Sequence, residues 1–155
     1  MKHVFWLKEG LIAGRCGPSE QTWNLQELKS AGFSAIASLN DAQQCDTQQM
    51  DSLAIEHQVF NLPNNVPPKP EDLAHYAKVL PSILTFIQQQ EQANKPVLLH
   101  CKTGVNRTEL VMAYYLMVNG AAPVHAVSQA RLASGHAFDA QGWDQFVYDV
   151  LYELQ

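Results

Sequence analysis

The sequence predicts an α/β fold, in which helices flank a central, mostly parallel sheet. Short apolar segments typical of strands alternate with longer segments typical of helices, the order expected of strand–helix–strand units. Glycines follow several of the helical segments, where helices commonly end. The chain has 155 residues, 46% of them hydrophobic and 16% charged. This composition suits one globular domain, and we expect it to span residues 1–155.

The boundaries of the expected elements follow from apolar spacing and from end signals. Two apolar runs around Lys8-Glu9-Gly10 predict a hairpin at a sheet edge. Gly32 and Asn119-Gly120 indicate helix ends, and Pro70 suits the first turn of a helix. In chain order we expect a hairpin of Val4–Leu7 and Leu11–Ala13, a helix over Thr22–Ala31, a strand over Ser34–Leu39, a helix over Asp46–Glu56, a strand over Val59–Leu62, a helix over Pro70–Gln92, a strand over Val97–Leu99, and helices over Thr108–Asn119, Pro123–Ala133 and Asp139–Leu154.

Charge and cysteine content exclude several classes of function. The formal net charge of -5 gives no basic surface, so we expect no nucleic acid as partner. No apolar stretch approaches the roughly 18 residues of a membrane span, and MKHVFWLKEG does not have the form of a signal peptide, so we expect no membrane contact and a cytoplasmic location. The three cysteines are too far apart for a zinc site or a disulfide framework, and we expect neither a metal nor another cofactor.

The stretch HCKTGVNRT, residues 100–108, has the composition of an anion-binding loop. It lies between an apolar strand and a helix, where backbone N–H groups and a helix N-terminus point at one place. That field favours the thiolate of Cys101. Arg107 offers a planar pair of donors to phosphate oxygens, Gly104 permits a tight turn, and the Thr108 hydroxyl can donate to the sulfur. His100 is interpreted as an organiser of the loop, because a thiolate needs no base.

These residues resemble the HCxxGxxR(S/T) loop of the cysteine-dependent protein tyrosine and dual-specificity phosphatases. The hairpin FWL…GLIAG and the proline-rich LPNNVPPKP also resemble the small atypical dual-specificity phosphatases. The resemblance implies the single-domain fold of that superfamily and hydrolysis of phosphomonoesters, with a phosphorylated protein or a small anionic phosphoester as substrate. It implies that Cys101 forms a phosphocysteine, that Arg107 binds phosphate, and that Thr108 assists hydrolysis. The loop that would hold the phosphoryl oxygens consists of Lys102, Thr103, Gly104, Val105, Asn106 and Arg107.

One position departs from the family pattern. Members of the family use an aspartate that follows a proline on the loop before the long helix, whereas this chain has Leu62-Pro63-Asn64. An amide cannot give a proton to the leaving group. Asp72 could replace the missing acid but also suits a helix start, and Asp139 could do so but also suits a helix N-cap. The third possibility is catalysis without a protein acid.

Two further assignments stay open at the level of the sequence. Gln141 resembles the glutamine that positions the attacking water in many of these phosphatases, although a polar residue on an exposed helix turn is an equally good interpretation. Asn64 also supports a different function, that of a pseudophosphatase that binds a phosphorylated ligand without turnover. Sulfur transfer on a rhodanese-like domain would use a similar cysteine, but the C-x5-R-[ST] spacing argues against it.

Overall fold

The computed structural model describes residues 3–103, 106–135 and 140–155, and within them the chain forms one five-stranded sheet. The strand order is β1-β2-β5-β3-β4, with β1 antiparallel to β2 and the other neighbours parallel. The mostly parallel α/β sheet expected from the sequence is therefore confirmed. The strands are β1 (Phe5–Lys8), β2 (Ile12–Cys16), β3 (Ala35–Ser38), β4 (Glu56–Val59) and β5 (Val97–Cys101).

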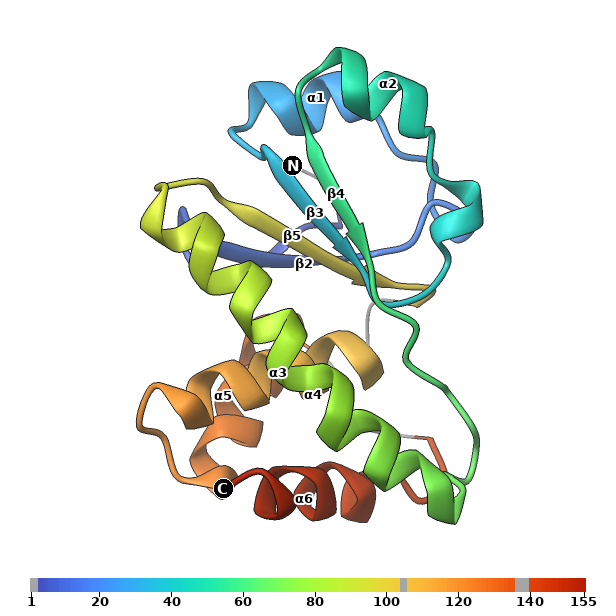
Figure 1. Ribbon diagram of the computed structural model, residues 1–155, viewed down its shortest axis with the longest axis vertical. Coiled ribbons are helices and arrows are strands. Elements are labelled where there is room, and N and C mark those ends of the chain that lie inside the picture. The colour runs from blue at the N-terminus through green and yellow to red at the C-terminus, as the bar shows by residue number, and fades with distance from the viewer. Residues whose placement is uncertain (1–2, 104–105, 136–139) are drawn as a thin grey trace.

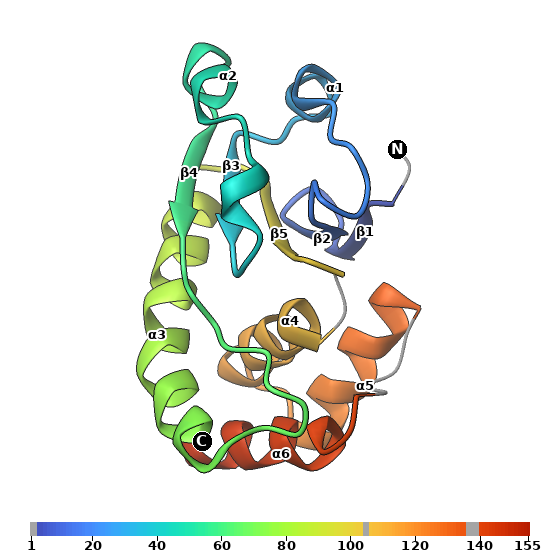
Figure 2. The same ribbon diagram turned by 90° about the vertical axis from the view of Figure 1, so that its right-hand side faces the viewer.

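Helices cover both faces of the sheet (Figure 1). One face carries the short helices and the other carries the longer ones, and the last helix packs against the other long helices rather than against the sheet, as the side view in Figure 2 shows. An apolar cluster lies on each face of the sheet, and alternate residues of β5 point to opposite faces. Leu98 belongs to the smaller cluster and Leu99 to the larger one. The helices are α1 (Leu25–Ser30) and α2 (Thr47–Ser52) on the first face, and α3 (Pro70–Gln92), α4 (Asn106–Val118), α5 (Pro123–Ser134) and α6 (Trp143–Glu153) on the second.

Several expected elements are confirmed where local signals are strong. The hairpin forms around Lys8-Glu9-Gly10, and its second strand continues to Cys16 because it also pairs with β5. Helix α3 has the expected bounds, with Pro70 in its first turn. Helix α4 is buried along most of its length, as its apolar sequence predicts, and it begins two residues earlier than expected.

The segment around β4 differs from the expectation. We expected a helix to Glu56 and a strand over Val59–Leu62, but α2 ends at Ser52 and β4 ends at Val59. Ala54 has a φ of 55°, which turns the chain out of the helix. Because β4 is an edge strand with mostly exposed or half-exposed side chains, its sequence EHQV lacks the apolar pattern that identifies buried strands.

Two helix starts also differ from the expectation. Helix α1 begins at Leu25, since the Asn24 side chain accepts a hydrogen bond from the Glu27 N–H at 3.0 Å and so caps the helix. Helix α6 begins at Trp143 with Gly142 at the N-cap position. The interpretation of Asp139 as the N-cap of this helix is therefore wrong.

The helices of the second face are amphipathic or contribute to the core. Helix α3 spans 23 residues and buries Tyr76, Leu80 and Ile83 among others, while polar residues lie along its exposed side. In the described part of the chain, no helix is both long enough and apolar enough to cross a bilayer. The amphipathic character of α3 is that of a helix packed against a sheet.

The central strand β5, which leads into the candidate loop, should contribute strongly to stability because it is paired on both sides and fully buried. Leu99 is fully buried between β2, β3 and the α3–α4 layer. We expect Leu99→Ala to lower the free energy of unfolding by about 2–5 kcal/mol, through lost burial and an unfilled cavity. Urea unfolding measures this change, with Gln88→Ala on the exposed side of α3 as a control that should change it by less than about 0.5 kcal/mol.

Candidate active site

The two ends of the loop at residues 100–108 are joined by a hydrogen bond. Cys101 is the last residue of β5, and Thr108 lies in the first turn of α4. The Thr108 hydroxyl donates to the Cys101 Sγ at 3.2 Å, and both side chains are buried. The structure therefore brings the predicted nucleophile and the predicted hydroxyl donor into direct contact. Lys102 and Thr103 are exposed, and Gly104 and Val105 lie outside the described residues.

Arg107 is buried at the same helix start, with 4% of its surface exposed. Its Nη1 lies 3.5 Å from the Leu62 carbonyl oxygen, at the limit of a hydrogen bond. Within the described part of the chain, its buried Nε has no hydrogen-bond partner, and neither does the Oδ1 of Asn106. A buried guanidinium with an unpaired donor is costly unless an anion compensates it, so this position suits an oxyanion.

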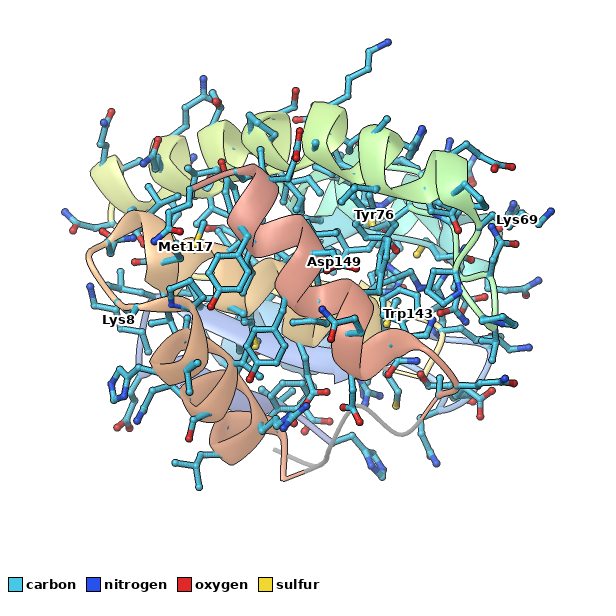
Figure 3. The ribbon with its side chains drawn as sticks, turned by 90° about the horizontal axis from the view of Figure 1, so that it is seen from below. Lys8, Lys69, Tyr76, Met117, Trp143 and Asp149 are labelled. Carbon is cyan, nitrogen blue, oxygen red and sulfur yellow. The ribbon has the colours of Figure 1, made fainter. Side chains whose placement is uncertain are left out.

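The proline-rich loop is fixed above this site by three side chains that donate to its carbonyl groups. These donors come from three different helices, and Figure 3 shows two of them, Tyr76 and Trp143, side by side. Burial raises the pKa of Tyr76, which keeps its hydroxyl a donor. The contacts are Arg107 to Leu62 at 3.5 Å, Tyr76 to Pro63 at 2.5 Å and Trp143 to Asn65 at 3.0 Å.

Asp72 stabilises this loop from the start of α3. Its carboxylate accepts hydrogen bonds from the Asn65 Nδ2 at 2.9 and 3.1 Å and from the Lys69 N–H at 2.8 Å. The side chain is 4% exposed, and its hydrogen bond from the Lys69 N–H satisfies a backbone donor at the start of the helix. Its hydrogen bonds therefore favour the structural interpretation. Asn64, at the position of the family acid, is exposed.

The segment before α6 packs against the same loop. Gly142 has a φ of 83°, and a Cβ at this position would lie 2.9 Å from the Pro68 ring. Glycine is therefore required both by the backbone conformation and by the close approach. Gln141 precedes it and is exposed. Asp139, the other candidate acid, lies outside the described residues.

His100 is fully buried behind Cys101, on the α1–α2 face of the sheet. Its Nδ1 lies 3.2 Å from the Cys101 carbonyl oxygen, and its Nε2 lies 2.5 Å from the Ser38 Oγ. The same Oγ lies 2.7 Å from the Nε2 of His57 on β4. Burial lowers the pKa of His100 to about 4, so the ring is neutral at pH 7. Ser38 and His57 were missed by the sequence analysis, since no motif links them to residue 100.

Aromatic packing closes the space behind His100. Trp23 contacts the His100 ring edge-on, with 4.6 Å between centroids, and its Nε1 donates to the Cys16 carbonyl at 3.0 Å. The Arg15 guanidinium lies 5.8 Å from the Trp23 centroid. The His100 ring is thereby shielded from solvent.

Asp41 is a carboxylate near the loop that the sequence analysis also missed. Its Oδ2 accepts from the Ser19 N–H at 3.1 Å and from the Ser19 hydroxyl at 2.7 Å. A Cβ on Gly17 would lie 2.2 Å from that oxygen and 2.6 Å from the Cys101 carbonyl oxygen. Asp41 therefore lies beside the backbone where the loop begins, at the carboxyl end of β3. Cys16, at the end of β2, also lies beside the start of the loop, since it is in register with Cys101 on the adjacent strand.

The neutral state of His100 predicts a stability that depends on pH. The unfolded chain binds this proton near pH 6.5, whereas the folded chain binds it only near pH 4, so the unfolded state holds more protons between these values. We expect the free energy of unfolding to fall by about 1.5 kcal/mol as pH drops from 6.5 to 5. His57, whose pKa is also lowered by burial, adds to this loss. Urea unfolding across this range measures it; an equally steep slope in His100→Asn would contradict the assignment.

The comparisons with known proteins agree with this geometry. The family model "Dual specificity phosphatase, catalytic domain" matches residues 18–130. A search of the curated proteins finds no match. Solved structures share the fold at low sequence identity. They include Tk-PTP in the active form (20% identity, TM-score 0.76, 97% of each chain covered), human DUSP28 (18%, 0.73, 100% of this chain and 97% of the other) and PTPMT1 in complex with PI(5)P (13%, 0.73, 99% and 97%).

The family match extends over more than half of the chain and includes the whole of the loop from His100 to Thr108. The solved structures extend the similarity in fold to nearly all of it. The chain therefore belongs to the dual specificity phosphatase family and is a cysteine-dependent phosphatase.

Proposed function

We propose that the protein hydrolyses phosphomonoesters through a phosphocysteine on Cys101, with Arg107 binding the phosphoryl group. The observation that supports this most directly is the hydrogen bond from Thr108 to the Cys101 sulfur, beside a buried guanidinium whose Nε has no partner in the described chain. A thiol that served only as core packing would not need either neighbour.

The reaction would proceed in two displacements at phosphorus. In the first, the Cys101 thiolate forms a sulfur–phosphorus bond, the ester oxygen–phosphorus bond breaks, and the alkoxide or phenoxide takes up a proton. In the second, water forms an oxygen–phosphorus bond, the sulfur–phosphorus bond breaks, and inorganic phosphate leaves. Thr108 then donates to the departing thiolate from its present position, 3.2 Å away.

The loop would stabilise the charge that develops on the phosphoryl oxygens. We assign this role to the Arg107 guanidinium and to the backbone N–H groups of Lys102 to Arg107, which include Thr103, Gly104, Val105 and Asn106. His100 would organise the start of the loop from behind. Gln141 would position the attacking water from the segment beside the proline-rich loop.

The source of the leaving-group proton is the part of the mechanism where this chain departs from the family. Asn64 cannot supply a proton, and both oxygens of Asp72 already accept hydrogen bonds from Asn65. We therefore propose that hydrolysis proceeds without a protein acid at this loop and favours esters with good leaving groups. Asp139 remains a candidate acid, and Asp41 joins it because of its place beside the loop.

The substrate class proposed is a phosphorylated protein or a small anionic phosphoester. The similarity to PTPMT1, whose structure contains PI(5)P, supports only the general expectation of a phosphorylated ligand. We also propose that residues 1–155 form one catalytic domain, since both apolar clusters pack against the same sheet. Phosphate recognition without turnover stays the alternative, supported by Asn64.

The role of Cys101 is tested by Cys101→Ser. We expect loss of aryl phosphate hydrolysis with retained binding of inorganic phosphate, because the serine hydroxyl is a far poorer nucleophile while Arg107 is unchanged. Arg107→Lys is the complementary variant and should lower turnover by about 10²–10³-fold, since a point charge replaces a planar pair of donors. Steady-state kinetics and calorimetry measure both effects, and full activity in Cys101→Ser would exclude the mechanism.

The missing acid is tested with a series of aryl phosphates whose leaving groups span several pKa units. We expect the rate to fall steeply as the leaving group worsens. Asn64→Asp should then raise the rate for the poorest leaving groups by about 10²-fold or more, since general acid catalysis contributes about 10²–10⁴-fold. Asn61→Asp, an exposed position three residues earlier in the same segment, is the matched control for added charge and should leave the dependence steep.

A different result would assign the acid elsewhere. A rate nearly independent of the leaving group in the parent protein would mean that a residue already supplies the proton. In that case Asp139→Asn, Asp41→Asn and Asp72→Asn identify it, since only the variant that lacks the acid becomes sensitive to the leaving group.

A further inference from the structure

Three buried or half-buried polar side chains form a continuous chain behind the loop. Ser38 on β3 is in register with His100 on β5, and it also reaches His57 on the edge strand β4. The distances from the Ser38 Oγ are 2.5 Å to His100 and 2.7 Å to His57, while the far side of His100 contacts the Cys101 carbonyl at 3.2 Å. Ser38 and His100 are fully buried, and His57 is half-buried.

The direction of these hydrogen bonds is determined by the acceptor at one end. The Cys101 carbonyl can only accept, so the neutral His100 ring must carry its proton on Nδ1. Its Nε2 is then a lone pair and must accept the Ser38 hydroxyl proton. Because that hydroxyl has one proton, Ser38 can only accept from His57, whose Nε2 must carry a proton. The reverse direction would place two lone pairs against each other at Cys101.

We propose that Ser38 and His57 are positioning residues of the active site, which form a one-way hydrogen-bond relay from His57 through Ser38 and His100 to the Cys101 carbonyl. The relay holds that carbonyl towards His100. In a trans peptide the C=O and N–H bonds point in opposite directions, so this contact directs the Lys102 N–H away from His100. This N–H is the first of the amides to which the proposed function assigns phosphate binding.

The surroundings of the relay are otherwise weakly polar. The Cys45 Sγ lies 3.9 Å from the His100 Nε2 and 4.0 Å from the Ser38 Oγ, and a thiol is a weak partner at such distances. Trp23 packs edge-on against His100. The charged groups that act on the two rings are Asp41 and Arg107 for His100 and Asp51 for His57, with Arg15 behind Trp23.

The relay predicts a specific tautomer that nitrogen NMR can observe in the full chain. In the parent protein at pH 7, a ¹H–¹⁵N correlation spectrum of the histidine rings should show His100 protonated on Nδ1 and His57 protonated on Nε2. A neutral histidine free in solution populates both tautomers. A single tautomer at each of the two rings would therefore indicate that the hydrogen bonds of the relay select it. Nε2 protonation of His100 in the parent protein would overturn the proposal, whether or not the protein turns over any substrate.

A matched pair of variants tests the direction of the relay. His57→Gln keeps an N–H donor and should preserve the Nδ1 tautomer of His100 and keep kcat within about twofold, since its donor replaces that of the imidazole. His57→Glu offers only an acceptor at pH 7, so Ser38 must donate to it and His100 must change to the Nε2 tautomer. Gln58→Glu, on the exposed neighbouring position of β4, adds the same charge without reaching Ser38.

The kinetic consequence rests on the proposed role of Cys101 as nucleophile. We expect His57→Glu to lower kcat for an aryl phosphate by about tenfold or more relative to Gln58→Glu, because one phosphate-binding amide loses its orientation. Equal kcat values, or an unchanged His100 tautomer in His57→Glu, would overturn the relay. Absence of turnover in the parent protein would instead contradict the proposed function, and the tautomers would still decide the relay.

Discussion

The hydrogen bond between the Thr108 hydroxyl and the Cys101 sulfur is the contact on which the rest of the site depends. It closes the loop from the end of the central strand to the first turn of a buried helix. Since β5 is paired on both sides and α4 is buried along most of its length, neither end of the loop can shift without disrupting the core. The Cys101 sulfur, the Thr108 hydroxyl and the Arg107 guanidinium are therefore held in place by the core on both sides of the loop.

The sheet separates two kinds of environment around the same strand end. On the α3–α6 face, Cys101 and Arg107 meet the proline-rich loop, with an unpaired donor that suits an anion. On the α1–α2 face, His100 is neutral, buried and fully hydrogen-bonded. A buried polar chain is stabilising only when every member has a partner, and here Ser38 provides the connection that His100 requires. The His100 ring itself thus adds no positive charge at pH 7 to the buried back of the loop.

The proline-rich loop is held in place by hydrogen bonds to its backbone and to Asn65. Tyr76 and Trp143 donate to its carbonyl groups, and Asp72 accepts from Asn65, so the loop is fixed at both its start and its end. These contacts do not depend on the side chain at position 64, which is exposed. An amide there is compatible with the loop, and in the proposed mechanism it leaves no proton donor at this position.

The sequence by itself determined the features that depend on neighbouring residues. The alternation of strands and helices and the bounds of α3 follow from local patterns. The spacing of Cys101, Arg107 and Thr108 is also local, because the three residues lie within one strand–loop–helix unit of nine residues. Only the tertiary structure decided the position of β4, the capping role of Asp72 and the contact of Ser38 with His57. An edge strand has little apolar pattern to reveal it, and hydrogen bonds between residues as distant as 38 and 100 arise from strand order, which no local spacing encodes.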